Sequence, residues 1–93
     1  MSESAIKRRM MRALAALPGC KAVKIHGNSY TERGTPDIIG SYHGRAFVIE
    51  NKVPGEEPTA IQQHRMAEWR AAGAVVLLCV DPAETIREIK GLT

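Results

Sequence analysis

Two short segments carry charged residues at the ends of stretches that otherwise have the composition of buried strands. Asp37 closes a Gly-Thr-Pro-Asp segment (residues 34–37), and a Glu-Asn-Lys segment (residues 50–52) begins thirteen positions after it. Charged groups are costly to bury unless they are paired, hydrogen-bonded or bound to a metal. Two carboxylates beside an ammonium group can hold a hard divalent cation and activate water on it. The pattern therefore makes metal-dependent hydrolysis the first hypothesis.

Strand geometry predicts that these charged side chains converge. Side chains alternate along a strand, so Glu50 and Lys52 point to the same face of the strand expected over residues 46–53. Asp37 begins the strand expected over residues 37–42, and residues 41–45 turn the chain back into an antiparallel partner. An antiparallel pair places the start of one strand beside the end of the other. Asp37 is therefore predicted to lie beside Glu50 and Lys52.

The sequence supports two interpretations of this cluster. Two carboxylates repel each other, so a Mg²⁺ or Mn²⁺ ion between Asp37 and Glu50 would stabilise the arrangement. Lys52 could then orient or deprotonate a bound water, or neutralise charge that develops on a phosphate. Alternatively, Lys52 forms a structural ion pair with Glu50 or Asp37 at the end of the strand.

Two further polar residues are candidates for the same site, and each also has a structural explanation. Gln62 lies on the inward stripe of the helix expected over residues 59–73, near its N-terminus and directed towards the strand end that carries Lys52. Thr59 and Gln62 also have the spacing of a capping box, in which Gln62 bonds back to the helix start. Glu3 could reach the metal site from the first helix, or it could favour the helix dipole.

The basic residues are concentrated on the first helix and in the stretch before Pro36. The formal net charge of +3 is compatible with a polyanionic partner, and a basic band beside carboxylates would attract phosphates to the place of reaction. A solvated helix face is the alternative explanation for the cluster on the helix. The residues predicted to contact nucleic acid are Lys7, Arg8, Arg12, Lys24 and Arg33.

Composition disfavours several other classes of protein. The chain has 93 residues, of which 44% are hydrophobic and 25% charged, as is usual for one globular domain with a modest core. The longest apolar run, residues 74–80, is too short to span a membrane, so no membrane partner is expected. Cys20 and Cys79 lack the spacing of a zinc site or a disulfide framework, which suits a reducing cytoplasm. No glycine-rich phosphate loop follows a strand, so nucleotide binding has no support.

Periodicity predicts an α/β fold in the order helix, three strands, helix, strand, helix. The first helix is expected over residues 3–17, with Ser2 as its N-cap and Pro18 and Gly19 ending it. Strands are expected over residues 22–26, 37–42, 46–53 and 74–80, and a last short helix opens at Asp81 and Pro82. The crossover through the second helix makes the last two strands parallel. The result is a four-stranded mixed sheet flanked by helices.

Taken together, these residues resemble the VRR-NUC domain. The resemblance rests on Glu3, the Gly-Thr-Pro-Asp and Glu-Asn-Lys segments, and Thr59 to Gln62 followed by Gly73 and Ala74. This family is a branch of the PD-(D/E)xK nuclease superfamily, found as stand-alone phage and bacterial proteins and as a domain of larger repair nucleases. The resemblance extends from Glu3 to about Val80. It implies a single domain over residues 1–93 with a restriction-endonuclease-like αβββαβ(α) core.

The resemblance also implies a role for each site residue. Asp37 and Glu50 would bind the metal together with the main-chain carbonyl of Asn51, and Lys52 would be the catalytic lysine. Gln62 would be the helix-borne active-site glutamine, and Glu3 the leading acidic residue. Asn51 departs from the family pattern, which usually has an apolar residue there. We expect its side chain to face away from the metal, and its polarity questions how fully the second face of the sheet is covered at this end.

Stand-alone members resemble small homodimeric endonucleases that depend on Mg²⁺ or Mn²⁺ and are associated with branched DNA such as four-way junctions. We therefore expect a metal-dependent DNA endonuclease that acts on branched or flapped DNA as a homodimer in the bacterial cytoplasm, with a part in DNA repair. A non-catalytic DNA-binding or scaffold module with the same fold is the alternative. A nuclease that cuts linear duplex at defined sequences is a third reading, disfavoured because nothing resembles a recognition domain.

Overall fold

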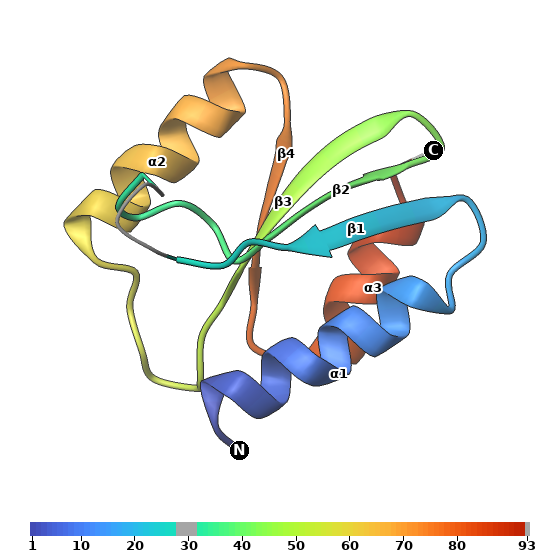
Figure 1. Ribbon diagram of the computed structural model, residues 1–93, viewed down its shortest axis with the longest axis horizontal. Coiled ribbons are helices and arrows are strands. Elements are labelled where there is room, and N and C mark those ends of the chain that lie inside the picture. Colours follow the sequence, from blue (N-terminus) through green and yellow to red (C-terminus); the bar gives the residue numbers. More distant parts are fainter. Residues whose placement is uncertain (28–31, 93) are drawn as a thin grey trace.

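The computed structural model describes residues 1–27 and 32–92 and consists of a four-stranded sheet with helices on both faces (Figure 1). This architecture confirms the predicted α/β class. The elements in chain order are α1 (Glu3–Ala15), β1 (Cys20–Lys24), β2 (Ile38–Tyr42), β3 (Arg45–Asn51), α2 (Ala60–Ala71), β4 (Val75–Cys79) and α3 (Pro82–Lys90).

The sheet has the order β1-β2-β3-β4 and is mixed, as predicted. The β1–β2 and β2–β3 pairs are antiparallel, whereas β3 and β4 are parallel. The tight hairpin between β2 and β3 consists of His43 and Gly44, which both have positive φ angles, of 47° and 85°. Two such residues give the turn whose twist matches the flanking strands. This turn fixes the register of the strands that lead to Asp37 and Glu50.

The main hydrophobic core lies on the sheet face that α1 and α3 cover. Ile6, Met10 and Leu14 recur every four residues along α1 and are almost completely buried, as the periodicity predicted. α1 ends two residues earlier than expected, but Leu17 still packs against the core. The other members of the buried cluster are Ile38, Phe47, Ile49, Leu77, Cys79 and Ile89.

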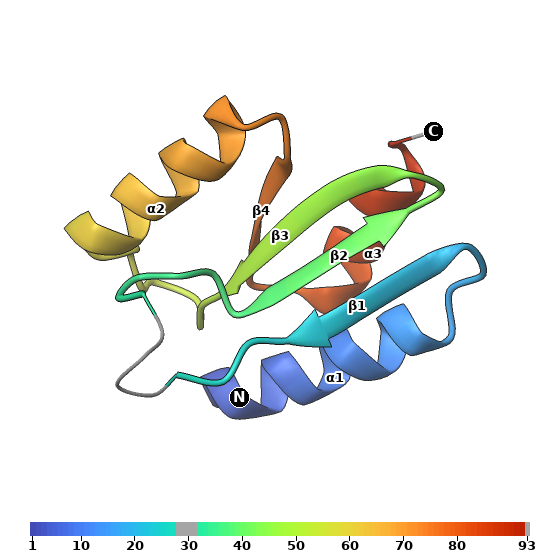
Figure 2. The same cartoon turned by 45° about the horizontal axis from the view of Figure 1, so that its top comes forward.

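α2 covers part of the opposite sheet face and packs beside β4. α1 and α3 lie on the other side of the sheet (Figure 2). Met66 is buried and Trp69 is partly buried, in agreement with their predicted inward orientation. Thr59 caps α2, and the predicted capping box with Gln62 is present. No helix among the described residues is long and apolar enough to cross a membrane.

One end of the sheet collects the termini of several elements. The start of β2 and the end of β3 meet there because the two strands are antiparallel. The segment between β3 and α2 passes beside the N-terminal end of α1 (Figures 1 and 2). Ser2 fixes that end, since its hydroxyl accepts a hydrogen bond from the main-chain N–H of Ala5 at 3.1 Å. Asp37, Glu50 and Glu3, which the sequence singled out, all lie at this end of the sheet.

The sheet has no room for a side chain at position 40, so even the substitution of Gly40 by alanine should destabilise the fold. Gly40 pairs with Phe47, and an added Cβ would lie 2.5 Å from Phe47 Cζ and 2.6 Å from the Lys21 carbonyl oxygen. We expect Gly40→Ala to lower the free energy of unfolding by about 1–3 kcal/mol, because the main chain of β1 cannot retreat without breaking its pairing. Urea denaturation followed by circular dichroism measures this change.

Gly27→Ala is the control for the general effect of a glycine substitution. An added Cβ at position 27 meets no described atom within 4 Å. If Gly40→Ala is as stable as Gly27→Ala, the contact between β2 and the Phe47 ring does not constrain the sheet.

Candidate active site

Three carboxylates meet at the end of the sheet described above. One oxygen each from Glu3, Asp37 and Glu50 lies within 4.8 Å of the others. The pairing of Ile38 with Ile49 explains why Asp37 and Glu50 are close. One step further along the same antiparallel register places Asp37 opposite Glu50. The first turn of α1 brings in Glu3. The structure thus brings together the three acidic residues that the sequence suggested.

Glu50 is the most constrained of these carboxylates. Its side chain is only 1% exposed, and Gln62 Nε2 donates a hydrogen bond to Glu50 Oε1 at 3.1 Å. Glu50 Oε2 is also buried, and no described residue donates a hydrogen bond to it. Burial first, and then the charge of Asp37, raise the pKa of Glu50 to about 7. A buried carboxylate oxygen without a donor is costly in the free protein, and it fits a cation ligand.

The two oxygens of Asp37 have different partners. Asp37 Oδ2 accepts hydrogen bonds from the main-chain N–H of Asn51 at 2.9 Å and from its side-chain amide at 3.3 Å. Asp37 Oδ1 lies 3.5 Å from the ammonium nitrogen of Lys7. Lys7 was predicted only as a nucleic-acid contact, so its position beside the carboxylates adds a second role. In the free protein it supplies positive charge beside Asp37.

The Asn51 side chain makes a contact that the sequence did not predict. The side chain lies on the sheet face opposite Glu50, as expected. Asp37 lies just before β2, and the Asn51 side-chain amide reaches the Asp37 carboxylate from that opposite face. The side chain therefore contacts one of the candidate metal ligands. Asn51 is completely buried, so the sheet face to which its side chain points, the one that α1 and α3 cover, is closed at this end.

Gln62 fulfils both of the roles that the sequence left open. Its Oε1 accepts a hydrogen bond from the main-chain N–H of Thr59 at 2.9 Å, which completes the capping box. Its Nε2 donates to Glu50 at the same time. A primary amide has an acceptor end and a donor end, so the two roles do not compete. The cap holds the amide in the orientation that Glu50 requires.

Lys52 is 6% exposed and follows the last residue of β3. Its main-chain N–H donates to the carbonyl of Cys79 at 2.9 Å, which extends the pairing with β4 and fixes the backbone. Its ammonium group opposes the rise in the pKa of both Glu3 and Glu50. Within the described part of the chain, no carboxylate lies within 4.0 Å of this ammonium group. The structural ion pair considered from the sequence is therefore not formed.

Glu56 is a neighbour of the site that sequence reasoning missed. Burial raises the pKa of Glu3, and the nearby carboxylates of Glu56 and Asp37 raise it further. Glu56 is held in place because its Oε1 accepts a hydrogen bond from the main-chain N–H of Val53 at 3.0 Å. Glu56 lies in a loop rich in proline, glycine and acid, where no spacing rule relates it to Glu3.

A brace between the loop before β2 and helix α2 was also missed. Arg65 Nε donates to the carbonyl of Arg33 at 2.9 Å and pairs with Glu32 at 3.1 Å, while Arg65 Nη1 lies 2.9 Å from Glu68. Gly34 has a φ of +79°, and an added Cβ would lie 2.8 Å from the carbonyl oxygen of Ile61. The segment that leads to Asp37 is thus packed against the helix that carries Gln62. Only the spacing of Arg65 and Glu68 on one helix face is visible in the sequence.

A hollow of about 400 Å³ adjoins the carboxylates. Lys7 and Arg33 line it together with Asp37, so positive charge reaches the edge of the candidate site. Arg8 and Arg12 are exposed on α1, and Lys24 is exposed at the end of β1. The remaining lining residues of the hollow are Ile25, Gly27, Glu32, Gly34 and Thr35.

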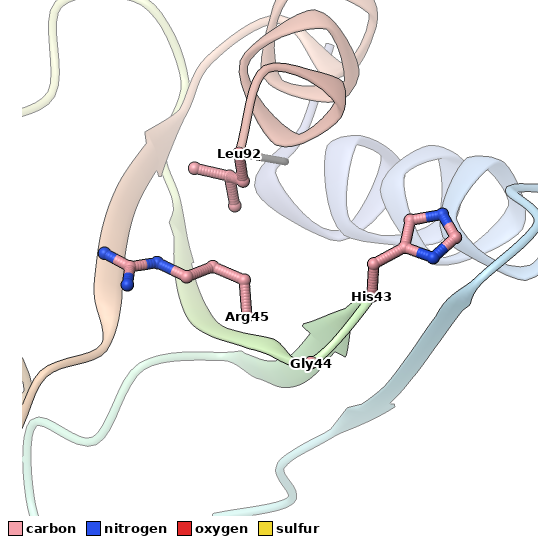
Figure 3. Close-up of a pocket in the computed structure, with 4 residues that line it drawn as sticks. All are labelled: His43, Gly44, Arg45 and Leu92. Atoms are coloured by element: carbon pink, nitrogen blue, oxygen red, sulfur yellow. The ribbon is translucent and has the colours of Figure 1, made fainter.

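A larger hollow, of about 600 Å³, lies at the β2–β3 hairpin, and Figure 3 shows its lining. The side chains of His43 and Arg45 point in different directions there, and Leu92 lies above them. Among the described residues, no carboxylate lines this hollow. The hollow that includes a residue of the carboxylate group is the smaller one, beside Asp37.

The donor set at the carboxylates fits a hard divalent cation. It offers oxygen atoms from Glu3, Asp37 and Glu50, one of them buried without a hydrogen-bond donor. Oxygen donors of this kind are the ligands that Mg²⁺ and Mn²⁺ prefer. The roles of the individual residues remain predictions.

The raised pKa of Glu50 predicts how the stability of the metal-free protein depends on pH. The pKa of Glu50 rises from an ordinary value of 4.5 to about 7, so the folded state binds this proton more tightly than the unfolded chain does. Stability should therefore fall as the pH rises through this window. Glu50→Gln removes the titration and keeps an acceptor for Gln62. The variant should gain stability relative to the wild type between about pH 5 and pH 8.

Urea denaturation in EDTA at about pH 5 and about pH 8 measures the free energy of unfolding of the wild type and of Glu50→Gln. Subtracting the free energy of unfolding of the variant from that of the wild type cancels the contribution of the other titrating groups. An equal difference at both pH values would mean that the pKa of Glu50 is not raised.

Comparison with solved structures identifies the fold. A structure named "VRR_NUC domain" has a TM-score of 0.77 and 19% identity, covering 98% of this chain and 97% of that chain. A "VRR_NUC domain protein" gives 0.73 and 17%, covering 97% and 86%. Hjc, a Holliday junction resolvase from the archaeal hyperthermophile Archaeoglobus fulgidus, gives 0.65 and 20%, covering 84% and 67%. Neither a family model nor a curated protein matches the sequence. The chain therefore has the fold of VRR_NUC domains, as its motifs predicted, and shares that fold with Hjc.

Proposed function

We propose that the protein is a single-domain, metal-dependent endonuclease that hydrolyses phosphodiester bonds in branched DNA. The observation that carries this proposal is the buried Glu50 carboxylate, which keeps one oxygen without a donor and faces two further carboxylates. A buried carboxylate beside two further carboxylates is unfavourable in a purely structural cluster, and a bound cation would offset the repulsion among them. Lys52 adds the ammonium group that hydrolysis of a phosphodiester needs.

The chain's own residues have distinct tasks in this reaction. A bound Mg²⁺ or Mn²⁺ ion would supply an acidified water and neutralise charge on the phosphate. Asp37, Glu50 and the main-chain carbonyl of Asn51 would hold the ion, with Glu3 at its edge. Gln62 keeps the Glu50 carboxylate in place. The Lys52 ammonium group would orient the attacking water, or stabilise the charge that develops as the phosphorus–oxygen bond breaks.

The DNA backbone would reach the carboxylates along the hollow that Lys7 and Arg33 line. Lys7 lies 3.5 Å from Asp37 in the free protein, and a bound cation would replace it as the partner of that carboxylate. Its ammonium group would then be free for a phosphate. Arg8, Arg12 and Lys24 are exposed outside the hollow and would fix the duplex by contacts with its backbone.

Branched DNA is proposed as the substrate because the fold is shared with a protein named as a Holliday junction resolvase. Cutting a four-way junction symmetrically needs two sites related by a two-fold axis. The described residues provide one group of three carboxylates per chain. We therefore propose that two copies of the protein act on one junction.

Cleavage of a labelled four-way junction in Mg²⁺ or Mn²⁺ tests the catalytic part of the proposal. We expect paired incisions by the wild type and a fall in rate of at least ~100-fold for Lys52→Met, which keeps the apolar stem but loses the charge. Lys90→Met, at the exposed end of α3, is the control and should cut normally. Equal rates for wild type and Lys52→Met would refute the assignment of Lys52.

A non-catalytic DNA-binding module with the same fold is the second candidate, favoured by the presence of Lys7 and Arg33 in the lining of the hollow. Salt titrations of junction binding separate the two. For a nuclease, binding in Ca²⁺ should be tighter than in EDTA, and Asp37→Ala should remove that difference. Arg33→Ala should weaken binding and reduce the slope of log affinity against log salt by about 1, because one phosphate contact is lost. Arg87→Ala on α3 should leave the slope unchanged.

Binding that is indifferent both to the divalent ion and to Asp37→Ala, without incision in any metal, would favour the binding module. A slope that is unchanged in Arg33→Ala would instead place the DNA path away from this hollow.

A further inference from the structure

Asn51 lies between two site residues, and its buried side chain makes a contact that the fold itself does not need. We propose that the side-chain amide of Asn51 is a positioning device that selects Oδ1 of Asp37 as the metal-binding oxygen. The inference rests on the proposed function of the site and extends it to a residue that does not itself touch the cation or the substrate through its side chain.

The geometry of Asp37 supports this assignment. Both N–H donors of Asn51 converge on the same oxygen, Asp37 Oδ2, the main-chain N–H at 2.9 Å and the side-chain amide at 3.3 Å. Neutral donors leave the negative charge of the carboxylate in place but occupy the lone pairs of that oxygen. Oδ1 is left to face cations, as its 3.5 Å separation from the Lys7 ammonium nitrogen shows for the free protein. The main-chain donor alone would tether the carboxylate at one point, and the second donor restricts its rotation.

The side chain is poorly suited to a purely structural role. Asn51 lies on the strand face that carries Phe47 and Ile49, which are both completely buried in the apolar core. Its Oδ1 is buried, and no described residue donates a hydrogen bond to it. Leaving such an acceptor unsatisfied costs stability, and an apolar residue of similar size would not incur this cost. The amide is therefore better explained by what its nitrogen does for Asp37.

The orientation of the amide follows from the charge of its neighbour. Rotating the amide by half a turn would exchange the positions of Oδ1 and Nδ2. Oδ1 would then point at the Asp37 carboxylate, and these two hydrogen-bond acceptors would repel each other. The unsatisfied Oδ1 is thus a consequence of directing Nδ2 towards Asp37. Partners that orient a ligand in this way commonly change metal affinity by about 10- to 100-fold when they are removed.

Mn²⁺ binding to the metal-free protein tests the inference without relying on turnover. We expect Asn51→Leu to weaken Mn²⁺ affinity at least ~10-fold, measured by electron paramagnetic resonance of the free ion at about pH 8. Its unfolding midpoint in EDTA should be equal to or higher than that of the wild type, because the unsatisfied acceptor has gone. Asn51→Ser, whose shorter side chain no longer brings an amide to Asp37, is the second variant and should weaken Mn²⁺ binding like Asn51→Leu.

Thr85→Val is the matched control. Thr85 is 2% exposed and its hydroxyl donates to the carbonyl of Asp81 at the N-terminal end of α3, so the substitution also removes a buried polar group. It should change stability without changing Mn²⁺ affinity. Junction cleavage adds a second readout: Asn51→Leu should require at least ~10-fold more Mn²⁺ for half-maximal rate and recover most of its rate at saturating Mn²⁺.

The outcomes separate the inference from the function on which it rests. A wild type that binds no Mn²⁺ overturns both. A wild type that binds Mn²⁺ and cuts DNA, with Asn51→Leu and Asn51→Ser showing the same Mn²⁺ affinity as the wild type, overturns the inference alone. If Asn51→Leu does not fold, Asn51→Ser decides by the same comparison.

Discussion

The arrangement of this protein around its site depends on keeping one carboxylate, Glu50, inside the fold. A charge that is 1% exposed requires compensation, and burial together with Asp37 raises its pKa to about 7. The compensation available in the chain is incomplete, because Gln62 satisfies one oxygen and leaves the other buried without a donor. The free protein therefore stores an unfavourable interaction that a bound cation would relieve. Such local cost is typical of sites that are organised for function.

Each element at this end of the sheet contributes to the same task. The hairpin at His43 and Gly44 sets the register that brings the start of β2 to the end of β3. The capping box of α2 orients Gln62, and Arg65 holds the loop before Asp37 against the same helix. The N-terminal turn of α1 supplies the third carboxylate and Lys7. Residues distant in sequence are thereby fixed within a few side-chain lengths, which is what preorganisation of an ion site requires.

Much of this could be predicted from the sequence, because it follows from short-range rules. Strand alternation and antiparallel pairing placed Asp37 beside Glu50, and the Thr59 to Gln62 spacing gave the capping box. What could not be predicted depends on side-chain reach between segments without a fixed spacing. The contact from Asn51 to Asp37 arises because Asp37 lies just outside the paired part of β2, and Glu56 approaches Glu3 from a loop. Residues 28–31, between β1 and β2, lie outside the described residues.

The central claim is that the carboxylates at the end of β3 form one divalent-cation site. A crystal of the wild type soaked in Mn²⁺, with anomalous scattering recorded near the manganese edge, tests it most directly. The account predicts a single strong peak within about 2.5 Å of both Asp37 Oδ1 and Glu50 Oε2. A peak bound elsewhere, or a manganese-free cluster in crystals that hold the ion at other positions, would contradict it.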